Sequence, residues 1–184
     1  MASVFTHAAV GLALGKVTTE RPMPKRFWWL CAACSCFPDA DVIGFTFGVR
    51  YGDLWGHRGL THSLLFALVF GVAVVALAFR EEKPFSPFWW RLVGCFAVVT
   101  ASHGVLDAMT NGGLGIGFLS PFDPTRYFFP FRPVAVSPIG VSSFFSTWGL
   151  RVILSELVWI WLPTLALLVG VHWVRRRRAG GAEI

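Results

Sequence analysis

Seven residues of the types that bind metal ions or carry protons stand where apolar segments of this 184-residue chain meet polar connections. Ionisable residues are rare inside strongly apolar sequence, so they are candidates for a functional site by default. The seven are His7, Asp39, Asp41, His57, His62, His103 and Asp107.

His103 and Asp107 stand four residues apart in an apolar segment. On a helix this spacing places both side chains on one face, within reach of a single cation. The alternative is a histidine that donates a hydrogen bond to a carboxylate inside a helix bundle. Other candidate ligands at the same level of the bundle favour the metal interpretation.

The segment from residue 57 to residue 63 is the most polar stretch next to an apolar run. On a continuous helix His57 and His62 would point about 140° apart, so a shared site requires a break, which Gly59 permits. Arg58 offers a planar donor that suits phosphate or carboxylate oxygens. In the alternative interpretation Thr61 caps a helix, His57 is solvated and Arg58 is an anchor at the membrane interface.

Asp39 and Asp41 follow Pro38, which biases Phe37 away from helical angles and is expected to end the preceding helix there. In an extended segment both carboxylates project to one side, which suits metal bridging or activation of water. The alternative is that Asp41 caps the next turn. His7 is the least specific candidate, because a lone histidine on an apolar helix is more often a hydrogen-bonding group than a ligand.

The composition excludes an ordinary soluble domain, because 55% of the residues are hydrophobic and only 14% are charged. The chain is therefore expected to be an all-α, multipass membrane bundle of four to five helices. Residues 1–174 would form one membrane-embedded domain, and residues 175–184 a basic, disordered tail. Three apolar segments are long enough to span a bilayer and two are shorter. The three are Leu60 to Phe79, Phe88 to Met109 and Trp148 to Val174, and the two are Val4 to Val17 and Phe27 to Phe37.

The net charge of +6 comes from basic residues that gather in alternate connections, as the positive-inside rule predicts, so a nucleic-acid partner is not expected. The C-terminus is then cytoplasmic, and the seven candidate residues lie at the non-cytoplasmic face. The aromatic, Pro- and Gly-rich connection from Thr110 to Thr147 is expected to cover that face. His7 inside the first apolar run argues against a cleaved signal peptide. The four cysteines are expected to be buried thiols rather than zinc ligands.

At these motifs the chain resembles the YdjM-type family of inner-membrane proteins, which are described as membrane-bound metal-dependent hydrolases. The resemblance rests on Thr6-His7, Phe37 to Asp41, His57 to Ser63, His103 to Asp107, and Ser120 to Phe122. The order of the ligands is also similar to that of zinc-dependent phospholipase C and the P1 nucleases. That similarity implies a metal site at His7, Asp39, His57 or His62, His103 and Asp107, with Asp39 or Asp41 near the attacking water. The later His and His-x-x-x-Glu ligands of those enzymes are missing, so a three-zinc site is not expected.

Together these features predict a metal-dependent hydrolase of the inner membrane that cleaves a phosphoester in a lipid or lipid-linked substrate. It would use one or two divalent ions, zinc first, with manganese or iron as alternatives. The alternative is a nonenzymatic metal-binding membrane protein: a carrier, a sensor or a regulatory partner. The predicted metal ligands are His7, Asp39, His57, His62, His103 and Asp107; the catalytic residues are Asp39, Asp41 and Arg58; and the phosphate-binding residues are Arg58, Arg126 and Arg132.

Overall fold

Residues 1–180, which a computed structural model describes, form a helical bundle, and within them extended chain pairs only at two isolated bridges. The all-helical membrane bundle is thereby confirmed. The elements in chain order are α1 (Val4–Thr18), α2 (Lys25–Cys36), the 3₁₀ segments η1 (Phe37–Phe47) and η2 (Leu60–His62), α3 (Leu64–Ala78), α4 (Pro87–Ala108), α5 (Val141–Phe144), α6 (Thr147–Glu156), the π-helical η3 (Leu157–Trp161) and α7 (Leu162–Gly180).

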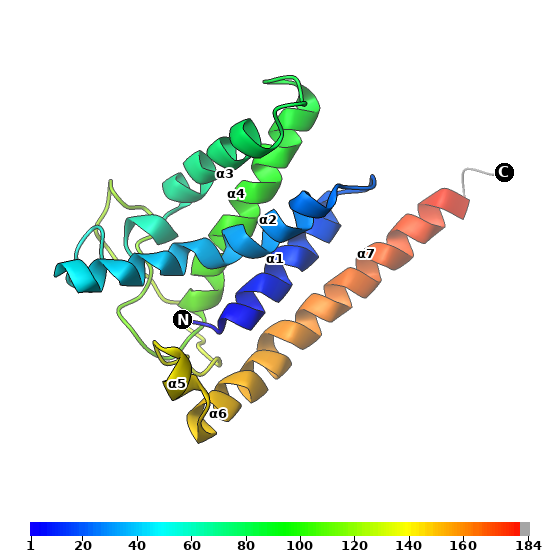
Figure 1. The fold of residues 1–184 in the computed structure, drawn as a ribbon. Helices are drawn as coiled ribbons and strands as arrows, with labels where there is room; N and C mark the ends of the chain where they lie inside the picture. Colours follow the sequence, from blue (N-terminus) through cyan, green and yellow to red (C-terminus); the bar gives the residue numbers. More distant parts are fainter. Residues whose placement is uncertain (181–184) are drawn as a thin grey trace.

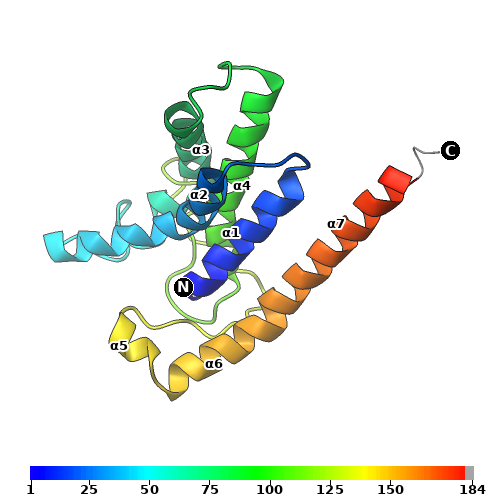
Figure 2. The same cartoon turned by 45° about the vertical axis from the view of Figure 1, so that its right-hand side comes forward.

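Helices α1 to α4 pack together, whereas α6, η3 and α7 form one long rod at the side of the bundle (Figures 1 and 2). The rod contacts α1 and is otherwise largely exposed. Within the described residues, three helical runs are long and apolar enough to cross a bilayer: Lys25–Phe47, Pro87–Ala108 and Thr147–Ala179. The apolar helices α1 and α3 have 15 residues each.

Two expectations about the spans were wrong. Pro38 does not end the second segment, because it occupies the first turn of η1, where a proline needs no hydrogen-bond acceptor for its nitrogen. The helix therefore continues past Asp39 and Asp41, and the two carboxylates are not in extended chain. The segment from Leu60 to Phe79 is not one helix either, since Ser63 adopts an extended conformation and caps α3 with its side chain.

The basic segment from Arg175 onward was expected to be disordered but continues α7 as a helix to Gly180, while residues 181–184 lie outside the described part. Arginine is a good helix former, and positive charge at a helix C-terminus is favoured by the helix dipole. The Arg175 guanidinium also donates to the carbonyl oxygens of Lys16 and Val17 at the end of α1. These bonds fasten the end of α7 to the end of α1.

Glycine allows α1 and α2 to approach closely. A Cβ atom on Gly11 would lie 2.5 Å from Ser35 Oγ and 2.6 Å from the carbonyl oxygen of Cys31, so only glycine fits without a shift of α2. Gly71 permits a similar approach of α3 to the backbone of α4. Close packing of small residues is a principal source of helix association in membranes, where burial from water contributes little.

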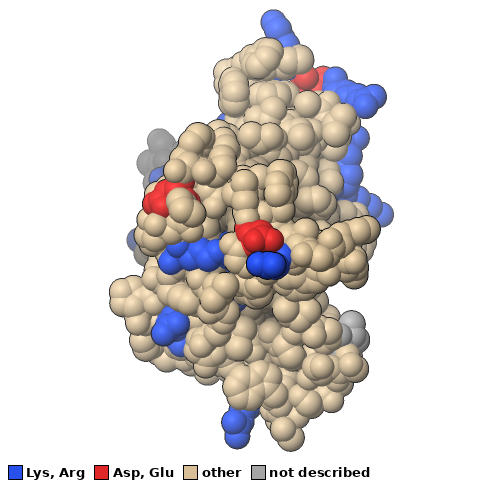
Figure 3. All heavy atoms as spheres, turned by 90° about the vertical axis from the view of Figure 1, so that its left-hand side faces the viewer, with Lys and Arg blue, Asp and Glu red and all other residues tan. Residues whose placement is uncertain are grey.

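Charge is confined to small areas of the surface. Figure 3 shows a mostly uncharged face, with Lys and Arg at its top, along its right edge and at its lower end, and a few small groups of both signs across its middle. The ends of α1 and α7 and the connection between α3 and α4 lie together at one end of the bundle (Figure 1). Lys16, Arg80 and the arginines at the end of α7 belong to this end, which we call the basic end.

Gly11→Ala should destabilise the protein by about 1–3 kcal/mol, because the added methyl group overpacks the contact between α1 and α2. The matched control is Gly94→Ala in α4, where a Cβ atom meets no atom within 4 Å. Thermal unfolding in detergent measures both variants. A Gly11→Ala melting temperature equal to that of Gly94→Ala would contradict the close packing.

Candidate metal centre

Four elements meet at the end of the bundle opposite the basic end: the start of α1, the start of η1, η2, and the last turns of α4 (Figure 1). Each contributes a histidine or aspartate side chain, the residue types that bind metal ions. Four of these side chains offer ligand atoms that all lie within 4.8 Å of one another, namely Asp39, His62, His103 and Asp107.

The distances between these atoms fit one ion. His103 Nε2 lies 3.2 Å from Asp39 Oδ1 and 4.0 Å from Asp107 Oδ2. His62 Nε2 lies 3.7 Å from the same Asp39 oxygen. Tetrahedral ligands about 2.1 Å from a zinc ion would be about 3.4 Å apart, so the four side chains are close to the spacing that a bound ion requires.

Both histidines are oriented through their second ring nitrogen. His103 Nδ1 lies 2.7 Å from the carbonyl oxygen of Ser35, which accepts a hydrogen bond from Nδ1–H, so in the neutral ring the lone pair is on Nε2. His62 Nδ1 lies 3.0 Å from the Thr61 hydroxyl, which donates to Asp41, and 3.2 Å from Asp41 Oδ2 itself. Such hydrogen bonds from the outer nitrogen to a carbonyl or a carboxylate are typical of metal-bound imidazoles.

Several buried polar atoms in and around this space make no hydrogen bond within the described part of the chain. Buried polar groups are nearly always paired, so a cluster of unpaired ones calls for an explanation such as an ion. The unpaired atoms are both ring nitrogens of His7, Nε2 of His62 and of His103, Oδ1 of Asp39, Oδ2 of Asp107, and Nε of Arg58. A cation would pair the imidazole nitrogens and the carboxylate oxygens at once.

His7 lies beside the four residues rather than among them. Its ring stacks on that of His103 with centroids 3.7 Å apart, and its Nε2 lies 3.3 Å from Asp107 Oδ1. It is fully buried in the second turn of α1. His7 therefore contacts two of the four residues without being one of them.

Asp41 and His57 form a layer behind His62. The Asp41 carboxylate lies 2.7 Å from His57 Nδ1 and accepts hydrogen bonds from the Thr61 hydroxyl and the Arg58 backbone N–H. The alternatives of a capping Thr61 and a solvated His57 were wrong, because Ser63 caps α3 and His57 is buried. A side chain with this many donors is a positioning group, and the predicted part of Asp41 in water activation gains no support from these contacts.

Arg58 is completely buried, so it is not an anchor at the membrane interface. Its Nε lies 3.2 Å from Asp107 Oδ2, and its terminal nitrogens donate to Gly112 O and the Thr110 hydroxyl. The backbone of Arg58 is left-handed, with φ of 67°, which is unfavourable for a side-chain-bearing residue. Hydrogen bonds to Asp41 and from Gly117 N–H hold this conformation.

The other two predicted phosphate ligands lie outside the cluster. Arg126 donates to the carbonyl oxygens of Tyr51, Asp53 and His57, and so braces the connection that carries His57. Burial lowers its pKa. The exposed Arg132 stacks over Phe128, with the guanidinium carbon 4.6 Å from the ring centroid. Neither Arg126 nor Arg132 therefore joins the cluster of Asp39, His62, His103 and Asp107.

The long connection after α4 folds over the site. Gly117 N–H donates to Arg58 O, Leu64 N–H donates to Phe118 O, and Ser137 N–H donates to Met1 O. These bonds join the connection to the residue 57–63 segment and to the start of the chain. The connection thus covers this end of the helices, as the sequence indicates.

Glu156 joins the last helical rod to the start of α1. It is buried against the start of α1, whereas Arg151 on the same helix is exposed. The Glu156 carboxylate accepts hydrogen bonds from the Ser3 backbone and hydroxyl and from the Thr6 hydroxyl. The π-helical segment η3 begins at the next residue, and such segments are frequent at functional sites.

The pKa of His62 reflects its carboxylate neighbours. Burial lowers the pKa, but the contacts with Asp39 and Asp41 outweigh burial and raise it above the usual value of 6.5. His62 consequently holds a proton more firmly than a free histidine, and a metal ion must displace that proton to bind.

Comparison with known proteins assigns the family. The sequence profile of the YdjM inner membrane protein family matches residues 1–179. This chain belongs to that family. It is also 41% identical over 182 residues to the inner membrane protein YbcI of Escherichia coli (strain K12), across 96% of this chain and 100% of YbcI. No solved structure matches this YdjM family member. The predicted family is confirmed, and with it the assignment to inner-membrane proteins.

Removing a ligand should abolish metal binding, whereas removing a positioning group should only weaken it. His103→Ala should leave no bound zinc, because it deletes one of four ligands. Asp41→Asn should retain the site with about 10- to 100-fold lower affinity, as expected for a partner of a ligating histidine. Metal analysis after equilibrium dialysis measures both, and His172→Ala in the exposed part of α7 is the control. Full zinc occupancy in His103→Ala would contradict the site.

Proposed function

We propose that this protein is a membrane-embedded, metal-dependent hydrolase that holds one divalent cation between Asp39, His62, His103 and Asp107. The observation that carries the proposal is the convergence of buried, unpaired imidazole nitrogens and carboxylate oxygens at ion-ligand spacing. Two nitrogen and two oxygen ligands suit zinc. The same ligand types also bind manganese or iron.

One ion explains the cluster better than two. Asp41, His57 and His62 form a second group of closely spaced ligand atoms. However, the 2.7 Å between His57 Nδ1 and Asp41 Oδ1 is a hydrogen-bond length, shorter than the separation of two atoms bound to one ion. In addition, His62 would have to ligate one ion through each of its nitrogens. We therefore assign Asp41 and His57 to orienting His62.

The open side of the site lies at Asp39. The Asp39 side chain is 16% exposed, while those of His62, His103 and Asp107 are fully buried. A divalent cation at this position would lower the pKa of a bound water toward about 7 and so supply a nucleophile at neutral pH. As the most exposed of the four, Asp39 would be the carboxylate nearest an entering substrate, and it would accept a proton from water.

A phosphoester of a lipid or lipid-linked molecule is the substrate class that the surroundings favour. The site lies at one end of apolar helices, and the connection that covers it exposes large aromatic side chains, among them Phe122 and Phe131. Exposed aromatic residues at a helix end suit the interface between lipid and water. Arg132, exposed on the same connection, is free to approach a phosphate, whereas the guanidinium groups of Arg58 and Arg126 are bonded to the protein.

A second candidate is a nonenzymatic metal protein. Its support is the completeness of the site: four protein ligands surround the space and three of them are buried. Structural zinc sites are closed by four protein ligands, while catalytic sites keep one position open. In this case the ion would hold α4, η1 and η2 together, and no ester would be cleaved.

The experiment combines metal loading with a panel of phosphodiesters, phosphomonoesters and phospholipids, with products measured by mass spectrometry. We expect zinc-dependent release of product that chelation abolishes and that His103→Ala reduces at least about 100-fold. Asp39→Ala should lower turnover and increase the rate at which the bound ion exchanges. Stoichiometric zinc with no product from any ester would reject the hydrolase and support the structural ion.

A further inference from the structure

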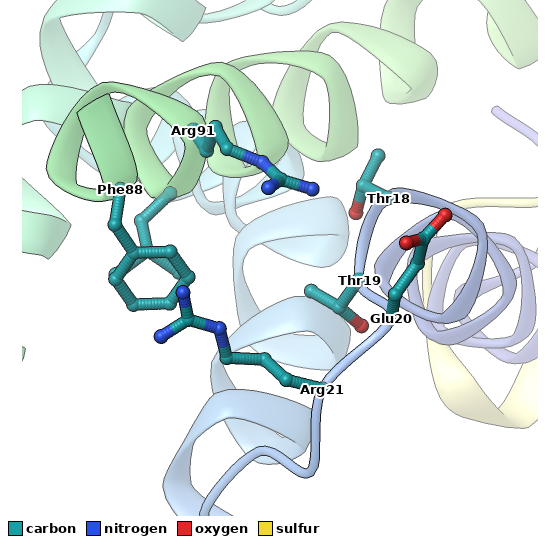
Figure 4. Close-up of a pocket in the computed structure, with 7 residues that line it drawn as sticks. Thr18, Thr19, Glu20, Arg21, Phe88 and Arg91 are labelled. Atoms are coloured by element: carbon teal, nitrogen blue, oxygen red, sulfur yellow. The ribbon is translucent and has the colours of Figure 1, made fainter.

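A second cavity lies at the basic end, opposite the metal centre. It has a volume of about 280 Å³ and lies between the end of α1 and the first turns of α4. Figure 4 shows Arg21 and Arg91 on its two sides, with Phe88 beside Arg21 and with Glu20 at the far edge. Neither its location nor its residues belong to the proposed hydrolase.

The two arginines have no acidic partner within residues 1–180. The ion pairs at this end are Arg26 with Glu81 and Arg175 with Glu20, and neither Arg21 nor Arg91 donates a hydrogen bond to a described residue. Arg21 is nevertheless held in place, because its guanidinium carbon lies 3.8 Å from the centroid of the Phe88 ring. A cation–π contact of this kind fixes the plane of the guanidinium and leaves its N–H groups free.

Glu20 is the acidic residue that lines the cavity, against two arginines, and it has a cation of its own nearby. Arg175 Nε lies 4.0 Å from Glu20, and the Arg175 terminal nitrogens donate to the last carbonyl oxygens of α1. The hydroxyl groups of Thr18 and Thr19 donate to carbonyl oxygens within α1. The cavity also lies at the N-terminal end of α4, the positive end of its helix dipole. The cavity therefore carries net positive charge.

We propose that this cavity binds a phosphate group between Arg21 and Arg91. Two planar guanidinium groups match the oxygens of a phosphate with two negative charges better than those of a singly charged phosphodiester. The cavity lies where apolar helices end, which is the level of lipid headgroups in a bilayer. A terminal phosphate on a lipid headgroup and a soluble phosphate ion share this chemistry.

The test uses the full-length protein, with bound lipid measured by native mass spectrometry after titration with phosphatidic acid or phosphatidylglycerol. The double variant Arg21→Gln/Arg91→Gln removes both guanidinium groups. Arg80→Gln/Lys83→Gln is the matched control, since it removes two exposed positive charges from the connection between α3 and α4, outside the cavity. Zinc content is measured in all variants as a check of folding, because the metal centre is at the other end.

We expect phosphatidic acid to bind more tightly than phosphatidylglycerol. The Arg21/Arg91 variant should lose at least about tenfold in affinity for phosphatidic acid, and the control less than about threefold. Competition by inorganic phosphate at millimolar concentration would support the cavity with a soluble phosphate as its ligand, and absence of competition would support the lipid. Equal losses in the two double variants, or no loss in either, would overturn the proposal, because binding would then follow total charge or lie elsewhere.

Discussion

The buried carboxylate of Asp107 is the group on which the rest of the structure depends. It is 0% exposed and lies among the Ala2 backbone N–H at 2.7 Å, Arg58 Nε at 3.2 Å and His7 Nε2 at 3.3 Å. An ionised carboxylate inside an apolar bundle is unfavourable by several kcal/mol unless other charges and hydrogen bonds compensate it. Arg58 and the N-terminal ammonium of Met1, 3.8 Å from Asp107 Oδ2, compensate part of the negative charge of Asp107 and Asp39, and a bound cation would compensate more of it.

The packing of the bundle follows from closing this site. Gly11 lets α2 approach α1, and the same turn of α2 presents the Ser35 carbonyl oxygen that orients His103. The long connection after α4 fixes the left-handed backbone at Arg58, and Glu156 ties the final helical rod to the start of α1. Elements that are far apart in the sequence therefore stabilise the same few side chains.

Residue type and helix position were enough to predict the all-helical membrane bundle and to indicate which histidines and aspartates collect at one end. The i,i+4 spacing of His103 and Asp107 holds in α4. Local rules failed where tertiary contacts decide: Pro38 fits inside a continuing helix, Thr61 donates to Asp41 rather than capping α3, and Arg58 faces Asp107. Ser35 acts through its backbone carbonyl, which its side-chain chemistry does not reveal. The Gly11 and Gly15 pair, four residues apart on an apolar helix, was a readable signal of close packing.

The most direct measurement is anomalous X-ray scattering at the zinc edge from crystals of the zinc-loaded protein. Our account predicts a single strong peak within about 2.3 Å of ligand atoms of Asp39, His62, His103 and Asp107. Asp41 and His57 should lie behind His62 and should not bind the ion. Two peaks would contradict the single-ion site. A peak elsewhere, or none in a folded protein, would contradict the account as a whole.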